Sequence, residues 1–139
     1  MADNSLLISK YFQSILEENQ EVREILGNDS HKIFPLLQPD TLTFPFIVHS
    51  RTGITVEYTK DIEYAHVGWY NIVNYTISCV SDDYVQCIEL ANAVRHAVET
   101  YRWKDEDIYI HPIQLLTVSE YTTDNDAFVE EMQFQCMVE

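Results

Sequence analysis

The sequence predicts an α+β fold, in which an N-terminal helix and a second long helix pack on a mostly antiparallel sheet. Apolar residues recur every three to four positions near the N-terminus and again over residues 84–101, as in helices with one buried face. Elsewhere apolar and polar residues alternate, as in half-buried strands. No repeat, low-complexity tract or Gly/Ser/Pro-rich linker divides the chain. We therefore expect residues 1–139 to form a single domain.

The first helix is expected to begin at Asn4 or Ser5, either of which can cap it. Gly27 ends it, because glycine readily adopts the left-handed conformation of a helix C-cap. A break is possible near Glu18 and Asn19. The buried face of this helix holds five apolar residues: Ile8, Phe12, Ile15, Val22 and Leu26.

The second helix follows Asp82 and Asp83, whose negative charges suit the positive N-terminal end of a helix. Its apolar stripe consists of Cys87, Ala91, Val94, Val98 and Tyr101. Alternation of apolar and polar residues predicts five extended segments, at residues 44–50, 54–58, 69–79, 113–117 and 128–138. The third of them is the longest strand before the second helix, and the last two follow that helix. The polar "TTDNDA" between the last two reads as a hairpin loop.

Three prolines punctuate the apolar stretch "HKIFPLLQPDTLTFPFIVHS". Pro35 is expected to end a short extended piece at Ile33–Phe34, and Pro39–Asp40 to start a turn. Pro45 stands at the start of the strand at residues 44–50, where proline's lack of a backbone N–H costs no hydrogen bond between strands. The prolines therefore frame a rigid loop that leads into the strand.

The composition is that of a soluble globular protein, with 46% hydrophobic and 22% charged residues. No secretory signal and no membrane-spanning stretch is evident, so we expect a cytosolic origin. Cys79, Cys87 and Cys136 occupy patterned apolar positions, and we expect them to be buried and reduced. The formal net charge is −15, and no Lys or Arg follows Lys104. The negative electrostatic field of such a chain repels phosphate groups and argues against nucleic-acid binding.

No pattern of catalytic or metal-binding residues is present. The glycines are isolated, the histidines lack metal-ligand spacing, and Asp105–Asp107 reads as a solvated turn. Aromatic residues around Gly68 form a candidate interface loop, which consists of Tyr64, Trp69 and Tyr70. The acidic residues of the C-terminal third form a candidate acidic surface: Asp105, Glu106, Asp107, Asp124, Asp126, Glu130 and Glu131.

The layout resembles the small tail-completion proteins of long-tailed phages, also called tail terminators or head–tail joining proteins. In that family an N-terminal helix precedes an "I-(F/Y)-P" segment and a "P-(F/Y)-(I/V)-(V/T)" strand, here "KIFPLLQP" and "FPFIVHS". The segments "NYTISCVSDDYVQCIELANAVRHAVE" and "AFVEEMQFQCMVE" match the family's strand–helix unit and closing strand. This chain departs from the family in two respects. The family's middle strands often carry more glycine, and they often carry a tryptophan closer to the second helix.

The resemblance implies a structural protein of a phage or prophage tail, made in the cytoplasm of a bacterial host. It implies a homo-oligomeric ring, commonly of six subunits, that contacts the tail tube and the head connector. DNA would pass through this ring without specific binding. No catalytic residue and no cofactor is implied. The alternative is an acidic binding module, such as an inhibitor or adaptor, that stays monomeric and covers a partner's basic surface. An enzyme is the third hypothesis.

Overall fold

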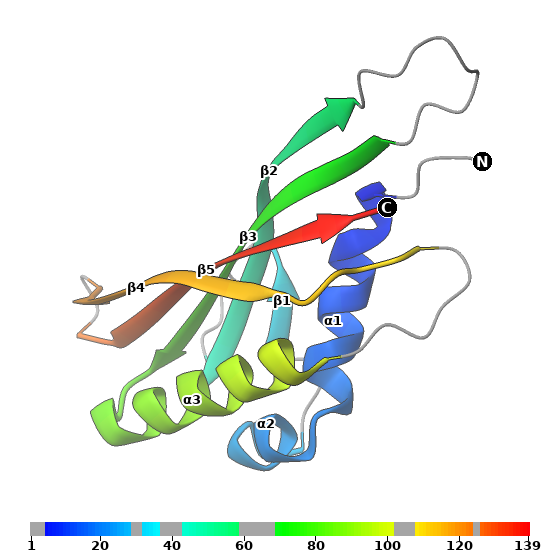
Figure 1. The fold of residues 1–139 in the computed structure, drawn as a ribbon. Coiled ribbons are helices and arrows are strands. Elements are labelled where there is room, and N and C mark those ends of the chain that lie inside the picture. Colours follow the sequence, from blue (N-terminus) through cyan, green and yellow to red (C-terminus); the bar gives the residue numbers. More distant parts are fainter. Residues whose placement is uncertain (1–4, 29–31, 37–42, 59–68, 102–107, 124–125) are drawn as a thin grey trace, which may run out of the picture.

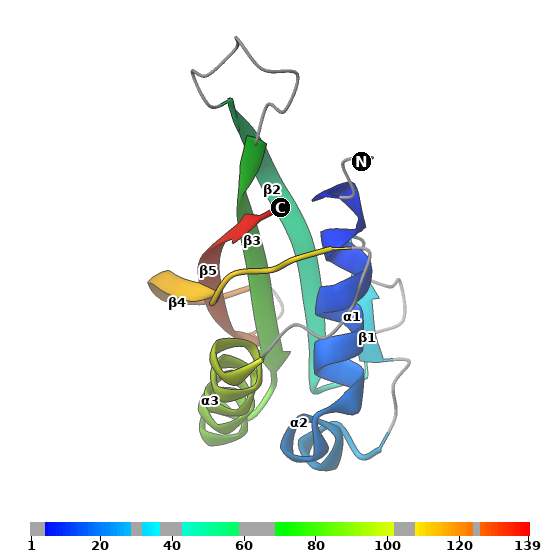
Figure 2. The same cartoon turned by 45° about the vertical axis from the view of Figure 1, so that its right-hand side comes forward.

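A computed structural model describes residues 5–28, 32–36, 43–58, 69–101, 108–123 and 126–139. It confirms the predicted α+β class, with helices that cover one face of a mostly antiparallel five-stranded sheet (Figures 1 and 2). After a 3-10 turn at Ser5–Leu7, the elements in chain order are α1 Ile8–Glu18, α2 Gln20–Ile25, β1 Ile33–Pro35, β2 Phe46–Tyr58, β3 Trp69–Ser81, α3 Tyr84–Thr100, β4 Gln114–Thr122 and β5 Phe128–Val138.

The strands lie in the order β1-β2-β3-β5-β4. β1 is parallel to β2, and every other neighbouring pair is antiparallel. The last strand along the chain, β5, lies beside the central strand β3, so β4 forms an edge of the sheet. Hairpins β2–β3 and β4–β5 account for most of the pairing, with α3 as the connection between them.

The strands before α3 differ from the prediction in one respect. Residues 44–50 and 54–58 were expected as separate alternating segments, but residues 46–50 and 54–58 both belong to β2. The pairing with β3 shifts between Arg51 and Gly53, so that Thr52 has no partner. Such a bulge adds one residue and resets the alternation, while the ladder continues on either side. The extended piece at Ile33–Phe34 is a true strand, which pairs with β2 and ends at Pro35.

The predicted break and ends of the helices are confirmed, but the predicted start of the first helix at Asn4 or Ser5 is not. A 3-10 turn occupies Ser5–Leu7, and α1 begins at Ile8 without a capping side chain, since Leu7 stands at the N-cap. α1 ends at Glu18, and the side-chain oxygen of Asn19 accepts a hydrogen bond of 3.1 Å from the backbone N–H of Val22, capping α2. Gly27 has φ of 76°, a left-handed conformation that favours glycine. At the start of α3, the Asp83 carboxylate accepts hydrogen bonds from the backbone N–H groups of Val85 and Gln86. The chain therefore turns where its capping residues predict.

The main core lies between the sheet and the helices. The ring of Phe12 in α1 stacks on that of Tyr75 in β3, with centroids 3.8 Å apart and planes 4° apart. The residues of both predicted apolar stripes are buried, except Tyr101, which is half-buried. Thiols pack in this core too, and the three cysteines are buried and free, as predicted: Cys79, Cys87 and Cys136.

A smaller apolar cluster covers one end of the other face of the sheet. Its buried members are Phe46, Val80, Ala127 and Val129, with three partly buried aromatic or aliphatic side chains around them: Phe34, Phe44 and Val48. Pro45 was expected at the start of a strand from Phe44, but it directly precedes β2, and the peptide bond before it is cis. The expected turn at Pro39–Asp40 lies outside the described residues.

Candidate functional site

The candidate interface loop lies mostly outside the described part of the chain. Tyr64 and the segment around it are not described. Trp69 and Tyr70 are the first two residues of β3 and pair in register with Tyr58 and Glu57 of β2. Their side chains are not described, so an aromatic interface at this position stays a prediction.

The candidate acidic surface is partly described and contains one error. Asp105, Glu106, Asp107 and Asp124 lie outside the described residues. Asp126 is exposed in the β4–β5 hairpin, and Glu131 is half-buried. Glu130, however, is only 7% exposed. The register of the sheet explains this, because Glu130 pairs with the buried Cys79 on the face that the helices cover.

Glu130 forms a carboxyl pair with Glu120 of β4, its partner in the antiparallel ladder. Burial and the hydrogen bond to Glu120 raise the pKa of Glu130 to about 7. The same bond lowers the pKa of Glu120. Below about pH 7, protonated Glu130 therefore donates a hydrogen bond to ionised Glu120. The Tyr84 hydroxyl of α3 donates to the same carboxylate, at 2.9 Å from one oxygen and 3.0 Å from the other.

This site was missed in the sequence, although a signal for it exists. Glu130 shares its parity with Phe128, Met132 and Phe134, so the alternation that predicts the strand also points Glu130 inward. Chemically the arrangement holds one proton between two carboxylates and fastens β4 to the start of α3. It keeps one negative charge of the pair at the edge of the sheet.

A second buried polar group joins α1 to the sheet. His49 is 1% exposed, and its two ring nitrogens contact the Tyr75 hydroxyl, at 2.7 Å, and the Gln13 amide oxygen. An amide oxygen can only accept, so Nε2 of His49 donates to Gln13 and Nδ1 accepts from Tyr75. Burial lowers the pKa of His49 to about 4, which keeps the ring neutral. The network orients α1 on β2 and β3.

The edge strand β4 is the most exposed element of the sheet. Every residue of this strand except Leu115 is exposed. Three large side chains remain 46–50% accessible: Leu116, Val118 and Tyr121. The outer backbone groups of β4 have no strand partner within the described residues. An edge with unpaired backbone groups and apolar side chains is a template for a further strand.

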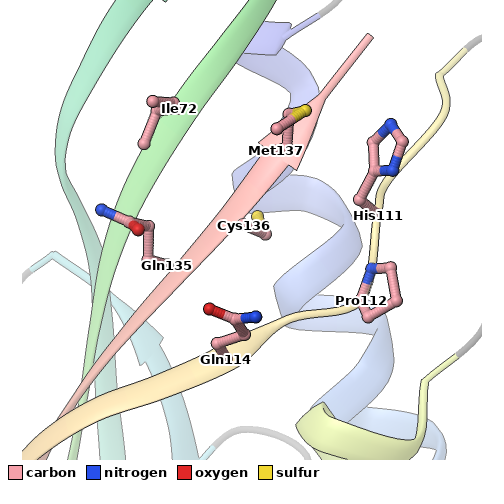
Figure 3. Close-up of a pocket in the computed structure, with 7 residues that line it drawn as sticks. All are labelled: Ile72, His111, Pro112, Gln114, Gln135, Cys136 and Met137. Atoms are coloured by element: carbon pink, nitrogen blue, oxygen red, sulfur yellow. The ribbon is translucent and has the colours of Figure 1, made fainter.

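A pocket of about 260 Å³ lies where β3, β5 and the segment before β4 meet (Figure 3). It is lined by Ile72, His111, Pro112, Gln114, Gln135, Cys136 and Met137. His111 Nε2 lies 3.7 Å from a carboxylate oxygen of Glu139. Burial raises the pKa of Cys136 to about 12, so its thiol stays protonated. This lining offers mixed polar and apolar contacts without an activated nucleophile.

Within the described ranges, no three His, Cys, Asp or Glu side chains gather closely enough to hold a metal ion. None of the helices in these ranges is both long enough and apolar enough to cross a membrane.

No protein-family model matches the chain, and no curated protein matches it. The fold, in contrast, is similar to a solved structure described as the virion of a native gene transfer agent particle. The TM-score is 0.71 with 15% sequence identity, and the match covers 92% of this chain and 91% of the other. The likeness therefore extends over nearly the whole fold.

Proposed function

We propose that the protein is a structural component of a phage or phage-like virion. The observation that carries this proposal is the fold shared over 92% of the chain with a component of a gene transfer agent virion. The resemblance of the sequence to tail-completion proteins points in the same direction. More specifically, the chain forms a ring that ends the tail tube and joins it to the head. We assign it no catalytic role.

The features of the described surface suit such a ring. β4 presents an open, partly apolar edge, as an assembling subunit requires. The strongly negative chain suits a channel that DNA crosses without sticking, because negative walls do not bind phosphate. We therefore expect a gel-shift assay at physiological salt to show no binding of duplex DNA. Micromolar binding would contradict this account of the channel.

Assembly is expected to depend on salt. Six copies, each with a formal charge of −15, bring about ninety negative charges together. Repulsion is screened beyond about 8 Å at physiological ionic strength. The isolated chain should be largely monomeric at low salt, and raised salt, magnesium or a tail-tube template should drive it towards the ring.

Light scattering across a salt series, with and without magnesium, tests this expectation, and electron microscopy identifies the closed rings. A chain that stays monomeric under every condition and does not add to isolated tail tubes would contradict the proposed function. An oligomer that dissociates as salt rises would show that ion pairs dominate the contact, against the account given above.

A further inference from the structure

The sheet has two open edges, which lie on opposite sides of the molecule (Figure 2). β4 forms one edge over its whole length. On the other side β1 pairs only with residues 47–49 of β2. Beyond them β2 pairs with β3 alone in the described part of the chain, and Arg51, Thr52, Thr55 and Val56 are exposed.

The directions of the strands allow these two edges to meet in neighbouring copies. β2, β3, β5 and β4 are each antiparallel to the next, so β4 runs antiparallel to β2. A second copy in the same orientation would place its β2 beside β4 as an antiparallel partner, with the helices of both copies on the same face. Such a head-to-tail contact repeats, and it closes into a ring when the rotation between copies permits.

One register matches the side chains of both edges. Each strand has one residue without a partner in its own sheet, Thr52 in β2 and Leu116 in β4. If Thr52 and Leu116 also stay unpaired across the interface, three pairs form on the face that the helices cover. Glu120 then lies opposite Arg51, Val118 opposite Ile54, and Leu115 opposite Val56. On the outer face Thr117 lies opposite Thr55. Apolar residues thus meet apolar ones, and β1 limits the contact at His49.

Charge favours this pairing over a symmetric one. Glu120 is exposed and carries the charge of the carboxyl pair at the edge of β4. β4 contains no Lys or Arg, so two β4 strands from different copies offer Glu120 no cation. Arg51 is exposed on β2, and within the described residues its guanidinium donates a long hydrogen bond, of 3.4 Å, to the backbone oxygen of Leu6. Opposite charges facing each other across two strands stabilise the pair.

We propose that copies of this chain assemble by antiparallel pairing of β4, over Leu115–Glu120, with Arg51–Val56 of β2 in the next copy. This interface rests on the proposed ring, and it adds which edges meet and in which register. Main-chain hydrogen bonds supply the attraction, as in other cases of strand addition, and the alternate side chains supply the specificity. The Arg51–Glu120 contact adds one ion pair, whereas the negative charges of neighbouring copies repel one another over the whole surface. Added salt screens this repulsion and therefore still favours assembly.

Cysteine cross-linking tests the register directly. Thr55→Cys and Thr117→Cys place thiols on two exposed threonines that would face each other, within the distance a disulfide spans. The native cysteines are buried and add no background. Under assembling conditions, a mixture of the two single variants should give a disulfide-linked dimer. The double variant should give a ladder of linked chains up to the full ring.

Two controls sharpen the test. Replacing Thr55→Cys by Thr76→Cys moves the thiol to the central strand β3 on the same face, and the cross-link should disappear. Adding Arg51→Glu to the Thr55→Cys chain sets two negative charges opposite each other. It should lower the yield of cross-linked dimer about fivefold, since charge pairs across strands are worth up to about 1 kcal/mol each.

The outcomes separate the interface from the proposed function. Rings that form without the Thr55–Thr117 cross-link would overturn this interface and leave the ring in place. A cross-link of Thr117→Cys to itself would show symmetric β4 pairing and would also overturn it. Chains that neither assemble nor cross-link at any salt would overturn both proposals.

Discussion

The carboxyl pair at the edge of the sheet makes stability depend on pH in a way that one substitution removes. Glu130→Gln keeps the shape of the side chain and can still donate a hydrogen bond to Glu120, but it has no proton to lose. Wild type and variant should therefore be equally well folded at low pH, where Glu130 is protonated. At high pH the wild type holds a charge in a buried position that the variant lacks.

The size and sign of the effect follow from the pKa of Glu130, which rises from 4.5 to about 7 on folding. At about 1.4 kcal/mol per pKa unit, this corresponds to about 3 kcal/mol. Water around the exposed Glu120 screens the pair, so we expect roughly 1–2 kcal/mol. The native state holds the proton more tightly than the unfolded chain. The contribution is therefore complete below pH 4.5 and is lost as the pH rises through about 7.

Urea unfolding of both proteins, followed by circular dichroism between about pH 5 and pH 8, measures this difference. The free energy of unfolding of the wild type should fall relative to that of Glu130→Gln as the pH rises. His49, whose pKa is lowered to about 4, affects stability in the opposite sense, with stability gained as the pH rises from 4 to 6.5. It is present in both proteins and cancels in the comparison.

A matched control is Glu131→Gln, which removes the same charge from the next residue, on the other face of the strand. It measures how much of any change comes from losing a charge on this strand rather than from the buried carboxyl. If the curves for Glu130→Gln and the wild type run parallel, Glu130 is ionised throughout and the described burial of its carboxyl is wrong.

Three further predictions follow from the core and the helix caps. Phe12→Ala should lower the free energy of unfolding by about 3–5 kcal/mol in urea titrations, because it removes the ring that stacks on Tyr75 and leaves a cavity in the core. Phe12→Leu should cost clearly less, and equal losses would mean that the ring is not packed. Asp83→Ala should cost about 1 kcal/mol through the lost cap of α3, while Asp82→Ala should cost only a few tenths. A thiol titration should label no cysteine rapidly in the native protein and all three after denaturation, since burial raises the pKa of each thiol: Cys79, Cys87 and Cys136. Rapid labelling of one thiol would place its strand or helix face at the surface.

Local features of the sequence were enough to place the helices. The stripe that begins with Ile8 and Phe12, the break at Asn19 and the ends at Gly27 and Asp83 all appear where the sequence predicts them. Each depends on a residue's own conformational preference or on contacts within one turn. Information of this kind is contained in a short stretch of chain and is visible without the rest of the fold.

Alternation also predicted which residues of β3 and β5 face the core, but not how far each strand extends. The bulge at Thr52 joined two predicted segments into β2, because a ladder continues past an extra residue whenever its partner strand does. The placement of Glu130 was an error of interpretation. Its parity indicated an inward position, but a carboxylate is expected at the surface unless a partner such as Glu120 is known.

The fold class, the buried faces of the helices and the burial of the cysteines could therefore be predicted from the chain alone. The position of β5 beside β3 could not, and it is this position that leaves β4 at the edge and brings Glu120 against Glu130. Pairing between strands far apart in the chain depends on the energy of the whole sheet rather than on any local preference. The open edges from which we infer assembly are a product of that pairing, so no single stretch of the sequence contains them.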